Sequence, residues 1–196
     1  MTKRNLILWS VVLFAILGSF SIAVQSPLLA WRRPIYILAG FSGVLALGLL
    51  QMQPLLAVGI LTTGSPMRNR RAHQWIGGLL VCFVALHIIG LWITSPPDVI
   101  DVFLFRSPTP FAVWGALAMW SLFLAFGLMV FRRSLAFKPA VVKQIHLCLV
   151  AVVVVTTILH AVLIEGTMGQ VSKWALCASV LLALILAGIK SFNKNK

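Results

Sequence analysis

Apolar residues gather in six long runs, separated by short segments rich in charged residues, proline and glycine. Each run approaches the ~20 residues that an α-helix needs to cross the apolar core of a bilayer. We therefore predict an all-α fold, an integral membrane bundle of six transmembrane helices. The predicted spans cover residues 6–24, 34–50, 73–93, 111–131, 144–164 and 174–189.

Proline and glycine mark the predicted span ends. Pro34 is a favoured first-turn residue and should begin the second span. Pro54 should extend or kink the end of that helix. The segments 62–71 and 94–110 are predicted to be loops. The first run also has the features of a signal peptide, but we expect an uncleaved helix, because the sixth helix then ends on the cytoplasmic side.

Composition supports a membrane setting. Of the 196 residues, 61% are hydrophobic and 10% are charged, and the mean hydropathy is +1.04. A soluble domain of this length could not cover so much apolar surface. Six spans leave no room for a soluble flavin or nicotinamide domain. We therefore expect residues 1–196 to form a single transmembrane domain whose main partner is membrane lipid.

The formal net charge is +13, from 16 Lys and Arg against 3 acidic residues. With a cytoplasmic N-terminus, 12 basic residues fall inside and 4 outside, which matches the positive-inside rule. This split predicts a multi-pass protein of the cell membrane, of the bacterial inner-membrane type, with both termini cytoplasmic. It also explains the charge without nucleic acid. The predicted inner tail carries Lys190, Lys194 and Lys196, and the local exceptions outside are Arg32 and Arg33.

The four histidines form two pairs, and the members of each pair are 14 residues apart. Fourteen residues turn a helix to within ~40° of four full turns and advance it by ~21 Å. Both histidines of a pair therefore lie on nearly the same helix face. The third and fifth spans run in the same direction, so their histidines can share two levels. His73 would be level with His146 on the inner side, and His87 with His160 on the outer side.

Two neutral imidazole nitrogens on opposite sides of one iron are the axial ligands that a b-type haem requires. The four histidines therefore predict two haem b groups, each with its metal bound by one histidine from each span. Arg70 and Arg71 could meet propionates of the inner haem, although topology is the larger explanation for them. Arg32 and Arg33 could do the same for the outer haem, where topology predicts fewer basic residues.

Other roles for buried histidines stay open. Histidines can hydrogen-bond between helices or relay protons, as in a haem-free scaffold or transporter. A proton relay normally includes carboxylates, and the predicted spans contain none except Glu165 at one end. Zinc is disfavoured, because the pairs are too far apart to share one ion and neither level offers thiolate or carboxylate ligands.

Two stretches carry a resemblance to a known family. Residues 68–87 read RNRRAHQWIGGLLVCFVALH, and residues 143–160 read KQIHLCLVAVVVVTTILH. With them the chain resembles the ferric reductase-like transmembrane domain family. That family includes the membrane parts of NADPH oxidases and ferric reductases, and the haem subunit of the periplasmic methionine sulfoxide reductase system. The spacing alone also looks like the cytochrome b subunits of quinol-oxidising complexes, which are longer chains.

The resemblance implies that His73, His87, His146 and His160 are the haem ligands. Oxidases and ferric reductases of the family usually continue into flavin and nicotinamide domains, whereas this sequence has no Gly-rich dinucleotide fingerprint. We therefore expect an electron-transfer subunit of a partner oxidoreductase rather than a complete enzyme. A flavoprotein reductase or a membrane quinol would be the donor, bringing the flavin or quinone, and a protein or metal chelate outside would be the acceptor. The alternative is a self-contained transmembrane reductase of ferric chelates or oxygen.

Overall fold

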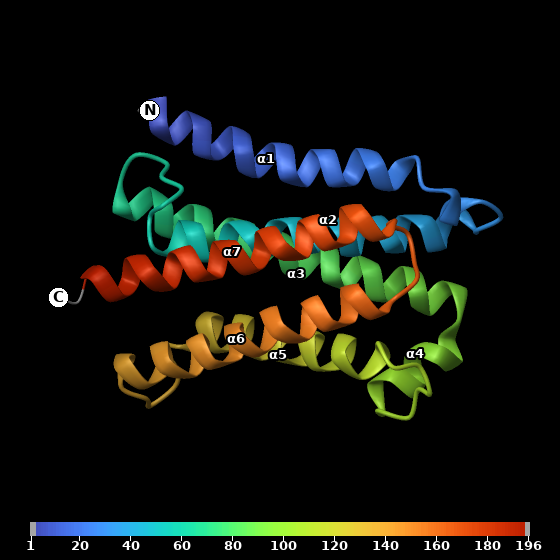
Figure 1. The fold of residues 1–196 in the computed structure, drawn as a ribbon. Coiled ribbons are helices and arrows are strands. Elements are labelled where there is room, and N and C mark those ends of the chain that lie inside the picture. The colour runs from blue at the N-terminus through green and yellow to red at the C-terminus, as the bar shows by residue number, and fades with distance from the viewer. Residues whose placement is uncertain (1–2, 195–196) are drawn as a thin grey trace. The chain divides into compact units, whose positions relative to one another are not determined.

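The structure, a computed structural model, describes residues 3–194 (Figure 1). The regular elements in this range are helical, and no strand occurs among these residues, so the predicted all-α fold class is confirmed. The short 3-10 helix η1 (Pro27–Leu29) joins the first two helices. The α-helices are α1 (Lys3–Val24), α2 (Pro34–Ala57), α3 (Pro66–Thr94), α4 (Pro96–Phe103), α5 (Ala112–Phe131), α6 (Pro139–Leu163) and α7 (Gln170–Lys194).

Six of these helices are long and apolar enough to cross a membrane. The exception is α4, whose 8 residues are far too short for a bilayer. The predicted number of spans is therefore confirmed, and the chain has the character of a multi-pass membrane protein. Which side of a membrane each helix end faces stays a prediction.

Four of the spanning helices begin earlier than predicted, and the two that bear histidines differ most. The third starts at Pro66 rather than His73, and the fifth, α6, starts at Pro139 rather than Gln144. Proline suits a first turn, because its φ is already helical and its missing N–H would have no partner there. The basic residues that we assigned to loops before these histidines therefore lie on the first turns of α3 and α6.

Two further segments differ from the prediction. The segment 94–110, predicted as a loop, contains α4, whose first turn is occupied by Pro96 and Pro97. Proline is common in loops, but at these two positions it is compatible with a helix start. The last helix is longer than the predicted range 174–189. Lys196, part of the predicted inner tail, lies outside the described residues.

The chain folds into two compact units. Unit 1 contains α1, α2, α7 and α3 as far as Gly90. In it α2 contacts both α1 and α7, and Figure 1 shows these three helices running alongside one another. Its apolar core lies where α1, α2 and α7 meet. The buried members of this core are Val12, Ile16, Met52, Leu55, Leu56, Leu61 and Ala183.

Polar contacts fasten both ends of unit 1 to the loop between α2 and α3. The Asn5 side chain donates to the Thr62 carbonyl at 2.6 Å and accepts from the Thr62 N–H at 3.1 Å. Near the other end of the chain, Lys190 Nζ donates to the Gly59 carbonyl at 2.9 Å. The start of α1 and the last turns of α7 therefore lie at the same end of unit 1, as an even number of spans requires.

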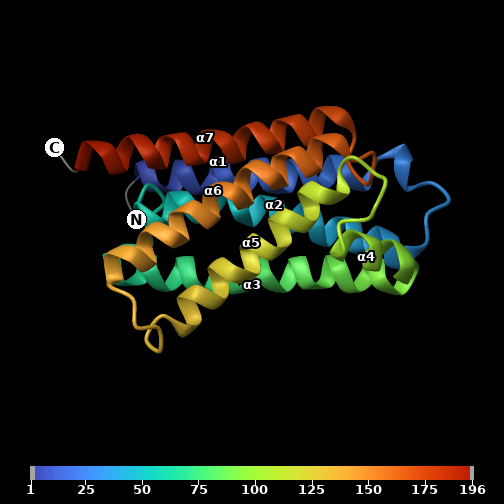
Figure 2. The same cartoon turned by 90° about the horizontal axis from the view of Figure 1, so that it is seen from below.

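Unit 2 covers Leu91–Ile164 and contains α4, α5, α6 and the last turn of α3. Here α5 and α6 form an antiparallel hairpin, and they lie side by side in both views (Figures 1 and 2). The short helix α4 packs on α5, where the rings of Phe103 and Trp120 are 6.3 Å apart between centroids. Each unit thus contributes one histidine-bearing helix, packed within its own unit.

Candidate metal-ligating histidines

The predicted pairs lie on two uninterrupted helices. His73 and His87 are on α3, within unit 1, and His146 and His160 are on α6, within unit 2. Neither helix has an internal proline between its two histidines. The 14-residue spacing therefore keeps both histidines of each helix on nearly the same face.

The second histidine of each pair donates a hydrogen bond to a backbone carbonyl of the neighbouring helix. His87 Nδ1 lies 2.8 Å from the Ala39 oxygen on α2. His160 Nδ1 lies 2.9 Å from the oxygen of Phe111, the N-cap of α5. A carbonyl can only accept, so Nδ1 carries the proton in both rings. A neutral imidazole with its proton on Nδ1 has its lone pair on Nε2, the ring nitrogen through which it would bind a metal.

The first histidines are held less well. His73 Nδ1 lies 3.1 Å from the Gln53 carbonyl on α2, which fixes the same tautomer. The Nδ1 of His146 is buried without a hydrogen-bond partner. The carbonyl of Ala125 on α5 is near enough to affect that ring but is outside hydrogen-bonding geometry. Three of the four histidines are therefore fixed in the tautomer with the proton on Nδ1 and the lone pair on Nε2.

The two helical hairpins, α2–α3 and α5–α6, place these groups in the same register. Ala39 and Gln53 are 14 residues apart, as are Phe111 and Ala125. Both spacings equal the spacing of the histidines that these residues oppose. Antiparallel helices with one rise per residue keep such a register along their whole contact. Each hairpin therefore places a carbonyl opposite each of its histidines.

The predicted arginines lie near the starts of two helices of unit 1, α2 and α3. Arg32 and Arg33 directly precede α2, and both are exposed. The Arg32 guanidinium lies 5.0 Å from the centre of the Tyr36 ring, a cation–π contact. On α3, Arg70 and Arg71 are also exposed, and Arg70 shares a face with His73, three residues further on. Their contact with a cofactor stays a prediction.

The donor chemistry of these histidines fits a haem. Within residues 3–194, no three His, Cys, Asp or Glu side chains are grouped for a metal ion, so a multi-ligand protein site is not formed there. Imidazole Nε2 atoms with a fixed tautomer suit haem iron. Over the same residues, the buried side-chain atoms without a partner are Gln51 Oε1, Gln53 Nε2 and His146 Nδ1. One of these atoms belongs to His146, and another to Gln53, whose carbonyl accepts from His73.

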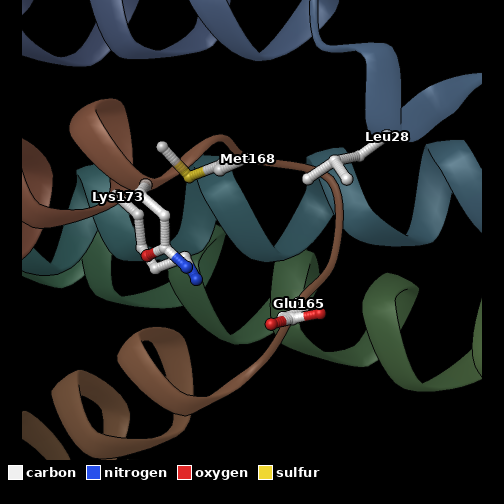
Figure 3. A pocket seen from close by; sticks show the side chains of 5 residues that line it. Leu28, Glu165, Met168 and Lys173 are labelled. Carbon is white, nitrogen blue, oxygen red and sulfur yellow. The ribbon is translucent and has the colours of Figure 1, made fainter.

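A separate pocket of about 250 Å³ lies in unit 1 (Figure 3). Its walls include Leu28 of η1, Met168 and the first turn of α7. Lys173 lines it although only 3% of its surface is exposed, and the Glu165 carboxylate also borders it. We predicted Glu165 only as the acidic residue at the end of a span. None of the predicted site residues lines this pocket, and it offers no histidine or cysteine.

Sequence reasoning missed the partners of the histidines. The acceptors are backbone carbonyls, which carry no residue signature. Gly43 and Gly115, which lie against the His87 and His160 rings, were not predicted as site residues. The sequence did offer a signal for these glycines, because Gly43 follows Ala39 by four residues and Gly115 follows Phe111 by the same number. Comparisons with known protein families, curated proteins and solved structures find no match to this chain.

Proposed function

We propose that the protein is a di-haem b-type membrane cytochrome that carries electrons across the bilayer. The observation that supports the proposal is the tautomer of His73, His87 and His160, in which Nδ1 carries the proton and Nε2 keeps the lone pair that a metal would bind. Backbone carbonyls hold metal-binding histidines in this way and make them better ligands.

We further propose that one haem is held by His73 and His146 and the other by His87 and His160. This pairing rests on the common 14-residue spacing and on the equal direction of α3 and α6 in a six-span topology. When bound, the haems supply one-electron redox chemistry. The four histidines would supply the imidazole nitrogens that hold the haems, and the apolar helices would supply the shell around them.

The resemblance to the ferric reductase-like family supports an electron-transfer subunit. The donor would be a cytoplasmic flavoprotein reductase or a membrane quinol, and the acceptor a protein or chelated metal on the outer side. The basic first turn of α3, with Arg70 and Arg71, suits the propionates of the inner haem or an acidic donor surface. Arg32 and Arg33 suit the propionates of the outer haem.

A reduced-minus-oxidised visible spectrum of the purified protein, with haem quantification, tests the proposal. We expect the bands of low-spin b-type haem and two haems per chain. A protein that is folded in detergent but shows no haem bands contradicts it and favours the scaffold or transporter alternative. Turnover with quinol alone, compared with an added flavin reductase, then separates the two classes of donor.

A further inference from the structure

The rings of His87 and His160 each lie directly against a glycine. A methyl group built on Gly43 would be 3.1 Å from His87 Nδ1 and 3.3 Å from its Cε1. One built on Gly115 would be 2.7 Å from His160 Nδ1 and 2.9 Å from its Cε1. Ordinary van der Waals contacts of a Cβ atom are 3.4–4 Å. Any side chain at these two positions would therefore press on the edge of the imidazole that makes the hydrogen bond.

Each glycine occupies the same position relative to the acceptor carbonyl. Gly43 follows Ala39 by four residues, and Gly115 follows Phe111 by four. In a helix the residue four positions on donates its N–H to that carbonyl. The Gly115 N–H does so at 3.1 Å, so the Phe111 oxygen accepts from both Gly115 and His160. A side chain at this position would stand beside the carbonyl that the imidazole must reach.

The four histidines form a series that follows the size of this residue. Where it is glycine, the distance from Nδ1 to the oxygen is 2.8 Å for His87 and 2.9 Å for His160. Opposite His73 it is Ala57, and the distance is 3.1 Å. Opposite His146 it is Met129, and no hydrogen bond forms. The larger this side chain is, the weaker the hydrogen bond to the imidazole.

We propose that Gly43 and Gly115 are positioning residues for the imidazoles of His87 and His160 as haem ligands. The proposal rests on the proposed function and adds two residues to its site. A short hydrogen bond from Nδ1 raises the basicity of Nε2 and holds the ring orientation. A more basic ligand stabilises the ferric state and lowers the midpoint potential of its haem. A methyl group at either glycine lengthens the bond and raises that potential.

The test compares four alanine variants of the full chain in detergent. Gly115→Ala and Gly43→Ala remove the proposed positioning role, and Gly115→Ala makes the closer contact. Gly127→Ala is the matched control on α5, because a methyl there meets nothing within 4 Å. Gly48→Ala controls for simple crowding, because a methyl there meets Ile16 Cγ2 at 2.9 Å and no histidine.

Redox titration and ferric low-spin EPR give the readout. We expect Gly115→Ala to raise the midpoint potential of one haem and to shift its EPR signal, and Gly43→Ala to do the same to a smaller extent. Gly127→Ala should change neither, and Gly48→Ala should lower the unfolding temperature without shifting either signal. Alanine is the better helix former, so a loss at Gly115 must come from the contact.

An unchanged potential and EPR signal in both Gly115→Ala and Gly43→Ala, at full haem content, overturns this proposal and leaves the di-haem function standing. A wild-type protein without haem overturns both. If Gly115→Ala does not accumulate, the milder Gly43→Ala still decides the matter, because its contact of 3.1 Å requires a movement of only a few tenths of an ångström.

Discussion

The second histidine of each helix (His87 or His160) differs from the first (His73 or His146) in the hydrogen bond that its Nδ1 atom makes. Both second histidines donate to a carbonyl at 2.8–2.9 Å. One first histidine makes a longer bond of 3.1 Å, and the other makes none. In the range 3–194, the buried side-chain atoms without a partner include Nδ1 of His146 itself and Nε2 of Gln53, whose carbonyl accepts from His73.

The comparison shows that helix register and side-chain size act separately. Register is the same in both hairpins and places a carbonyl opposite every histidine. The two shortest bonds are those with a glycine four positions after that carbonyl, Gly43 and Gly115. The rings of His87 and His160 are consequently held by short hydrogen bonds. The first level keeps unsatisfied polar atoms in an apolar setting, where they are costly unless water or a ligand group pairs with them.

The largest effect on haem content is expected when one of the proposed histidine ligands is removed. His160→Ala and His87→Ala should each remove the same haem, and His73→Ala and His146→Ala should each remove the other. Haem content per chain should fall from about two to about one in each variant, because a bis-histidine haem loses most of its affinity with one axial ligand. Pyridine haemochrome quantification measures this.

The control is Cys148→Ala, two residues from His146 on the same helix, which changes an exposed thiol and should keep both haems. The pairing is wrong if His73→Ala and His160→Ala remove the same haem, as judged by the midpoint potential of the haem that remains.

The two levels should also titrate separately. Two short hydrogen bonds make the second pair the more basic ligands, which stabilises ferric iron and lowers the potential of that haem. Arginines near His73 favour the reduced state at the first level and raise its potential. Both effects have the same sign, so the haem of the first pair should have the higher midpoint potential. A redox titration with a single one-electron step and about one haem per chain contradicts this.

The hydrophobic pattern was sufficient to predict the helices, because transmembrane length and apolar runs fix them. It misplaced their starts at Pro66 and Pro139, since basic residues can lie in a first turn as readily as in a loop. It also missed α4, whose prolines occupy permitted first-turn positions. These errors concern helix ends, where local chemistry decides more than hydrophobicity does.

Only the parts of the candidate site that are formed by distinctive side chains could be predicted from the sequence. The spacing of the four histidines predicted which residues share a helix face. Their acceptors could not be predicted, because the Ala39 and Phe111 carbonyls are identified only by the register of two packed helices. Gly115 could have been found by comparing the two hairpins, since Gly43 and Gly115 follow equivalent acceptors at the same distance along the chain.

Met129→Ala should make the surroundings of His146 resemble those of His87 and His160. With a smaller residue four positions after Ala125, His146 should reach the Ala125 carbonyl as His73 reaches that of Gln53. The midpoint potential of the haem of the first pair should then fall, while the other haem stays unchanged. Leu128→Ala, the neighbouring truncation on α5, is the control for lost volume. An unchanged first-level potential in Met129→Ala would show that side-chain size does not limit this bond.

The smallest expected effect is that of Gln53→Leu, which tests whether the unsatisfied amide matters to the site. The side chain of Gln53 is 8% exposed and its Nε2 has no partner, whereas its backbone oxygen accepts from His73 at 3.1 Å. Leucine keeps the volume and the backbone oxygen and removes the buried donor. An unpaired buried polar group costs about 1–3 kcal/mol, so the variant should be as stable as the wild type or more stable by about that amount. His73 should still bind its haem, and thermal unfolding followed at the Soret band measures both properties. A loss of the first-pair haem would show instead that the amide donates to the cofactor or to a water that holds it, and Gln51→Leu, which removes the neighbouring unpaired acceptor, would then identify which of the two amides is responsible.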